Sequence, residues 1–235
     1  MANVEVRTFQ VHNFDSISFR ALGSMTIYQG EEEGLTVQGE PSALEHIKVD
    51  VENRQLQIRL YTWYDFLFLP RPAKYEIRLK NLHRLDVSGS ADVEMAELIS
   101  SELKLSTSGS GNVHIGSLEV SHFQINVSGS SHLRIDELVS ENVVINASGS
   151  GHFVLKGRAD RLEIRTSGSA EVDALQLDAN HVKISVSGSG KFVVTALDTL
   201  DVSVSGNGRV GYRGDPRISQ AISGSGTVYR VDQSA

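Results

Sequence analysis

The chain has 235 residues, of which 40% are hydrophobic and 22% are charged, and it contains 21 glycines and no cysteine. This composition is typical of a folded, β-rich protein, and it excludes disulfide bonds, thiolate metal sites and a cysteine nucleophile. The formal net charge of −7 and the lack of a basic stripe argue against a nucleic-acid partner.

The first 80 residues have a β-strand pattern without a regular repeat, and we expect them to form a cap. Residues 22–27, with apolar Leu22, Met25 and Ile27, resemble an incomplete first coil of the repeat described below. The segment EPSALEHI predicts one short helical turn, and VDVENRQLQIRL predicts a hairpin that turns near Asn53. A cap is expected because an open solenoid end exposes core residues and unpaired strand edges.

The segment WYDFLFLPRP, residues 63–72, gathers aromatic and apolar residues before two prolines. One interpretation is a strand end and cap packed on the core. The other is an exposed patch that contacts another subunit or a membrane surface. The residues of this candidate interaction patch are Trp63, Tyr64, Phe66 and Phe68.

From residue 81 onward the sequence repeats a Ser-Gly-Ser unit or a close variant. The units begin at Ser88, Ser108, Ser128, Ser148, Ser167, Ser187, Ser205 and Ser223, with spacings of 18 to 20 residues. With the first serine counted as zero, positions −5, −3, −1, +5 and +7 are apolar in 35 of 40 cases. The interleaved positions −4, −2, +4 and +6 are apolar in 5 of 32, which is the alternation of β-strands with one buried side.

A twenty-residue unit of this kind cannot bury its apolar side alone, so the units must stack. The predicted fold class is all-β: a right-handed, single-stranded parallel β-helix of about eight coils with 18–20 residues each. We expect a cap at residues 1–80 that continues into the repeat β-helix at residues 81–235, as one structural domain. A leucine-rich repeat is excluded because its first leucine position, occupied by Leu82 in the first unit, is polar in the other seven, and the units are too short for propeller blades.

The central glycine of each unit is expected to form a structural corner, where the chain needs a tight bend and an unusual backbone angle. These glycines are Gly89, Gly109, Gly129, Gly149, Gly168, Gly188, Gly206 and Gly224.

Position +4 is expected to form an exposed polar ladder along the stack, and this ladder is the candidate binding site. Its residues are Asp92, Asn112, His132, His152, Glu171 and Lys191. Stacking would place His132 beside His152 and Glu171 beside Lys191, the latter pair as a weak ion pair. Two histidines could share a metal, but no third ligand is evident, so no metal site or cofactor is predicted. The repeated serines are assigned to structure, and no catalytic residue is predicted.

Three stretches carry a resemblance to a known family: FDSISFRALGSMTIYQG, YEIRLKNLHRLDVSGSADVEM and the recurrent SGSG-x-V units. They resemble the family called putative auto-transporter adhesin, head GIN domain, over nearly the whole chain. The resemblance implies a right-handed parallel β-helix with an adhesin role, exported to the periplasm or cell surface of bacteria. The chain as given shows neither a recognisable signal peptide nor a transmembrane segment.

We therefore expect a non-catalytic, envelope-associated binding protein whose partner is a glycan or a protein at a cell surface. Two alternatives stay open. One is a structural scaffold that forms homo-oligomers through its ends or through the candidate interaction patch. The other is a polysaccharide-active enzyme, since parallel β-helices also house such sites, although fold does not imply function.

Overall fold

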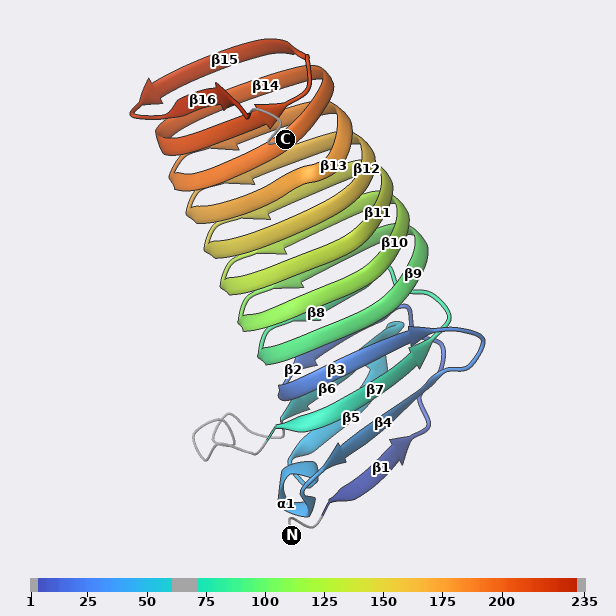
Figure 1. Cartoon of the computed structure of the whole chain (residues 1–235). Coiled ribbons are helices and arrows are strands. Elements are labelled where there is room, and N and C mark those ends of the chain that lie inside the picture. The colour runs from blue at the N-terminus through green and yellow to red at the C-terminus, as the bar shows by residue number, and fades with distance from the viewer. Residues whose placement is uncertain (1–3, 61–71, 232–235) are drawn as a thin grey trace.

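The computed structural model describes residues 4–60 and 72–231 of the chain. These residues form sixteen strands and one short helix, α1 (Pro41–Leu44), arranged as an elongated stack (Figure 1). Before the repeat region lie β1 (Glu5–Phe9), β2 (Ser16–Arg20), β3 (Leu22–Gln29), β4 (Gly34–Gly39), β5 (Ile47–Glu52), β6 (Gln55–Leu60) and β7 (Ala73–Leu79). The repeats form β8 (Arg84–Val87), β9 (Ser90–Thr107), β10 (Ser110–Val127), β11 (Ser130–Ala147), β12 (Ser150–Thr166), β13 (Ser169–Val186), β14 (Ser189–Arg213), β15 (Arg217–Gly224) and β16 (Thr227–Arg230).

Successive repeats stack in parallel, as the sequence predicts. Each strand from β9 to β14 pairs with the next one, and Ile125 lies opposite Ile145 in a parallel register. The result is a β-solenoid of about seven turns. The predicted all-β solenoid fold is therefore confirmed.

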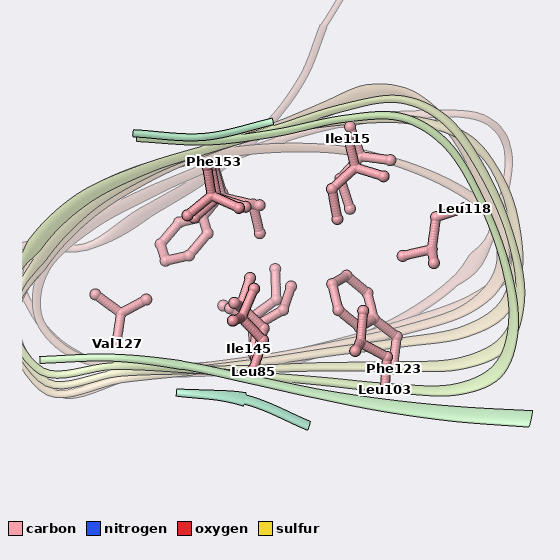
Figure 2. Close-up of a cluster of buried hydrophobic side chains, with 14 of the residues drawn as sticks. Leu85, Leu103, Ile115, Leu118, Phe123, Val127, Ile145 and Phe153 are labelled. Carbon is pink, nitrogen blue, oxygen red and sulfur yellow. The ribbon is translucent and has the colours of Figure 1, made fainter. Parts of the chain in front are cut away.

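The alternating apolar residues fill the space between two facing sheets. Figure 2 shows Phe123 and Ile145 on one sheet, Ile115 and Phe153 on the other, and Leu118 on the short side that joins them. We call the sheet of Phe123 the first sheet and that of Phe153 the second sheet. All five residues are at most 1% exposed. The period-two pattern thus produces one continuous dry core.

The N-terminal residues extend both sheets, but not in chain order. In the first sheet β2 pairs in parallel with β8 and also with β6, and in the second sheet β3 pairs with β9 and also with β7. The coil of β2 and β3 therefore lies between the coil of β6 and β7 and the first repeat. Residues 22–27 stand in register with the repeat, Met25 opposite Val93 and Ile27 opposite Met95, as expected for a first coil.

Antiparallel strands finish this end of the stack. β1 pairs with β4, β4 with β7, and β5 with β6, all antiparallel. The hairpin of β5 and β6 turns at Asn53 and Arg54, which have φ values of 50° and 64°, and α1 provides the expected helical turn. One core cluster runs from Val11 to Val210, so packing is unbroken across residue 80, and the division at that residue stays a prediction.

The eight predicted corner glycines lie where the chain bends from the first sheet to the second. Backbone pairing continues through these bends: the Ser148 amide donates to the Val127 carbonyl at 2.9 Å, and the Ser150 amide donates to the Gly129 carbonyl at 3.1 Å. A Cβ added at Gly149 would overlap the carbonyl oxygen of Gly129.

The physical reason for glycine at most of these corners is therefore close stacking of the backbone, and not the unusual backbone angle that the sequence suggested. Positive φ occurs at two of the eight, Gly206 with 156° and Gly224 with 117°.

Candidate functional site

A long groove with both polar and apolar lining residues runs along the outer side of the first sheet, beside the glycine corners. Its volume is about 840 Å³. We call it the serine groove, because it contains the first serine of seven Ser-Gly-Ser units and the residues two places before each of them. These residues are Asp86, Ser88, Ser106, Ser108, Asn126, Ser128, Asn146, Ser148, Arg165, Ser167, Ser185, Ser187, Ser203 and Ser205, and Ser18, Arg20 and Arg84 extend the groove toward the N-terminal end.

The two columns of the serine groove differ in exposure. The serines at the corner, such as Ser128 and Ser148, are exposed, whereas Asn126 and Asn146 beside them are half-buried although they point outward. Because the serines stand at the bend of each coil, they form one wall of the groove. The less exposed residues two places before them form its floor. The groove therefore offers hydroxyl and amide groups at the interstrand spacing of about 4.8 Å.

The polar groups of the groove floor bond to one another along the stack. The Asn146 side-chain amide donates to Asn126 Oδ1 at 3.0 Å. The charged residues pair within their own strands: Arg84 Nε lies 2.6 Å from Asp86 Oδ2, and Arg165 Nη2 lies 2.7 Å from Glu163 Oε2. Two of the three arginines that line the groove are thus paired with a carboxylate of their own strand.

The predicted polar ladder lies on the second sheet, on the other side of the glycine corners. Its six residues stand opposite one another in consecutive coils, in the expected order. Asn112 donates to Asp92 Oδ1 at 2.7 Å, and the His132 and His152 rings have centroids 5.8 Å apart. From His132 to Lys191 the ladder lines a shallow depression of about 650 Å³.

In this ladder, Glu171 Oε2 lies 3.4 Å from His152 Nδ1. The ion pair expected between Glu171 and Lys191 does not occur among the ion pairs of the described residues. Within residues 4–60 and 72–231, no three histidine, cysteine or acidic side chains are grouped so that they could hold a metal ion. The ladder is therefore a row of polar side chains in register, and its role in binding stays a prediction.

A charged cluster next to the ladder was not anticipated from the sequence. His114 Nδ1 lies 2.8 Å from Glu94 Oε2, and His114 Nε2 lies 2.7 Å from Asp136 Oδ2. Arg134 contacts the other oxygen of Asp136 at 2.7 Å. Glu94 and His114 share a column and could have been paired by the repeat, but Asp136 lies 22 residues from His114, in another column.

The cluster shifts the pKa values of its members in opposite directions. The hydrogen bond to Asp136 raises the pKa of His114, and Glu94 adds to this effect against a smaller opposing effect of desolvation. The hydrogen bond from His114, together with Arg134, lowers the pKa of Asp136. Both ring nitrogens can donate only when the imidazole is doubly protonated, so the geometry favours the charged form.

We expect this cluster to make stability depend on pH. Because the folded pKa of His114 is raised, its stabilising contribution is full below the ordinary histidine pKa of about 6.5 and is lost as the pH rises through the folded value. Urea unfolding of the wild type and His114→Gln should therefore differ more at about pH 5.5 than at about pH 8.5. Asp136→Asn should remove the same pH-dependent part of the stability. If the difference between the wild type and His114→Gln were equal at both pH values, the cluster would not be the source of the pH dependence.

The candidate interaction patch of Trp63, Tyr64, Phe66 and Phe68 lies outside the described residues, so its role stays a prediction. In the part of the chain that the structure describes, no helix has the length and apolarity needed to cross a membrane.

Stacked parallel coils around one continuous core define the protein as a β-solenoid. Residues 13–136 and 115–216 match the model of the family described as "Putative auto-transporter adhesin, head GIN domain". The chain belongs to this family, as the resemblance of its sequence implied.

Solved structures of similar proteins cover almost the whole chain. A "putative lipid binding protein" from Parabacteroides distasonis ATCC 8503 is 25% identical, with a TM-score of 0.92 over 98% of this chain and 97% of that chain. A "putative adhesin" from Parabacteroides merdae ATCC 43184 is 20% identical, with a TM-score of 0.83 over 97% and 96% of the two chains. Another from Bacteroides fragilis NCTC 9343 is 23% identical, with a TM-score of 0.74 over 98% of each chain. No curated protein matches the chain.

Proposed function

We propose that the protein is a non-catalytic, envelope-associated adhesin whose serine groove binds an extended, uncharged glycan chain. The observation that carries the proposal is the continuous groove itself, with its hydroxyl and amide groups repeated coil after coil. Hydroxyls and amides both donate and accept hydrogen bonds, which suits the many hydroxyls of a glycan. Many weak contacts over several coils can add up to useful affinity.

The chemistry of the groove favours binding over cleavage. Glycoside hydrolysis ordinarily uses two carboxylates that flank the bond to be broken. Among the described residues that line the groove, the one carboxylate is Asp86, and Arg84 holds it at 2.6 Å.

The groove also favours a glycan over a lipid tail. The large apolar side chains Phe19, Phe123 and Phe153 are less than 2% exposed and lie inside the packed core. A lipid tail would need a broad apolar surface. The apolar side chains that line the groove, Val87, Val127, Ala147 and Val186, are at most 4% exposed and lie between the serines and the polar residues two places before them. The lipid-binding description of the Parabacteroides distasonis structure nevertheless makes a lipid vesicle a necessary comparison.

The test compares asparagines on opposite sides of the glycine corners. The double variant Asn126→Ala/Asn146→Ala should weaken binding to a neutral linear glycan, identified on a glycan array, about thirtyfold, since each of the two lost hydrogen bonds costs about 1 kcal/mol. Asn112→Ala removes a similar amide from the polar ladder and should leave this affinity unchanged. Isothermal titration calorimetry gives both affinities.

Three outcomes would count against the proposal. Loss of binding in Asn112→Ala alone would move the site to the polar ladder. Binding to vesicles of neutral phospholipid, together with no binding to any glycan, would show that the ligand is a lipid. Shortened glycan products after long incubation would show that the protein is an enzyme that cleaves the glycan.

A further inference from the structure

The last strand of the first sheet, β15, has an unpaired edge. It pairs with β14 on one side, and no described strand lies on the other. All eight of its residues are exposed, including Ile218 at 43% and Ile222 at 40%. These two isoleucines stand in the inward columns, opposite Leu200 and Val204, which are at most 1% exposed. The last coil therefore presents the open end of the core.

The edge strands at the other end of the stack are protected by charge. β1 carries the ion pair of Glu5 and Arg7 at 2.7 Å, and β5 carries Lys48 and Asp50 at 3.5 Å. Charged side chains on an edge strand hinder pairing with another chain. β15 lacks this protection, because after Arg217 at its first position it has no charged residue. The two ends of the stack thus differ in their readiness to pair.

The sequence of β15 is complementary to itself in one antiparallel register. If a twofold axis passes through Gln220, perpendicular to the first sheet, inward residues of the two copies stay inward. Ile218 then faces Ile222 of the partner subunit on both sides of the axis, and Gln220 faces its own copy. An amide donates and accepts at once, so two Gln220 side chains can bond to each other.

Charge also fits this register. Arg217 faces Ser223 of the partner subunit, so no like charges meet along β15. Gln220 stands in an inward column, opposite Val202 of the preceding coil. In a monomer its side chain is exposed at the open end of the core, so the inward position does not stabilise it. Facing copies of the amide give this polar residue a partner between two pairs of isoleucines.

We propose that two copies of the chain form a twofold dimer by antiparallel pairing of their β15 strands, centred on Gln220. The contact is isologous, because each copy contributes the same surface. The dimer joins the first sheets of two solenoids into one, and the two serine grooves open on the same side of it. Two grooves on one particle increase avidity for a long ligand.

The absence of native cysteine allows a direct test of the register. Directly opposite residues of an antiparallel pair have Cα atoms about 4.5–5.5 Å apart, which a disulfide can bridge. Gln220→Cys should therefore give a disulfide-linked dimer under mild oxidation. In the same register Ser219 faces Ala221, and its own copy lies at a diagonal distance of about 7–8 Å, so Ser219→Cys should link much more slowly.

Solution mass provides the second measurement. The wild type should approach twice the chain mass of 25.6 kDa in sedimentation equilibrium as its concentration rises. Gln220→Lys places two like charges face to face and should weaken the dimer more than about tenfold. Its urea unfolding midpoint, measured under monomeric conditions, should match that of the wild type, because the side chain lies in an exposed strand.

The proposal is overturned if the wild type stays monomeric at all concentrations, or if Ser219→Cys and Gln220→Cys link equally fast. A ladder of larger oligomers would indicate head-to-tail stacking of the two ends instead. These readouts do not depend on any glycan, so failure of the dimer and failure of the proposed function can be told apart.

Discussion

Gly149→Val is expected to destabilise the protein by about 4 kcal/mol or more, or to prevent folding. A Cβ at this corner would overlap the carbonyl oxygen of Gly129 and lie 2.9 Å from that of Ser128. Both atoms belong to the backbone of the preceding coil, which cannot move without breaking the pairing of Ser148 and Ser150 through the bend. Urea unfolding measures the effect, provided that the dependence of the unfolding free energy on urea concentration is the same in both proteins.

Ser148→Ala is the matched control for this corner. The serine side chain is exposed beside Gly149, and its replacement should change the free energy of unfolding by about 0.5 kcal/mol or less. Equal losses in Gly149→Val and Ser148→Ala would show that the corner is not held by close stacking. A larger loss in Gly206→Val than in Gly149→Val would give backbone angle the greater weight, since φ is 156° at Gly206.

Phe153→Ala should cost about 3–5 kcal/mol of unfolding free energy. The ring is 0% exposed and projects between the two sheets (Figure 2). It also lies over Gly151, where an added Cβ would come within 2.6 Å of the ring carbon Cζ. Because Gly151 has no side chain that could move into the cavity, we expect a cost in the upper part of this range.

Val154→Ala provides the comparison in the same strand. Val154 follows Phe153, points outward and is half-buried, so its truncation should cost less than about 1 kcal/mol. Thermal or urea unfolding of the two variants tests whether the period-two pattern separates core from surface. Similar costs for both would contradict that separation.

Part of the candidate site could be predicted from the sequence. The spacing of twenty residues was enough to place Asp92, Asn112 and His132 in one column, since equal coils bring equal positions together. The serine groove was missed, although its signal is present in the repeated Ser-Gly-Ser units and in polar residues such as Asn126 and Asn146 two places before them. An alternating pattern shows which side chains point outward, but it does not show whether the outer surface is flat or hollow.

The sequence by itself determined the repeat unit, the apolar rows, the parallel stack and the positions of the bends. These follow from local rules, because a period of two sets the buried side of a strand and a repeat of constant length sets the register. Only the tertiary structure decided that the coil of β6 and β7 lies beyond that of β2 and β3, against chain order. It also decided that His114 reaches Asp136 and that the bends hollow the first sheet into a groove. These features depend on long-range pairing and on the reach of side chains between coils, which no periodicity in the chain encodes.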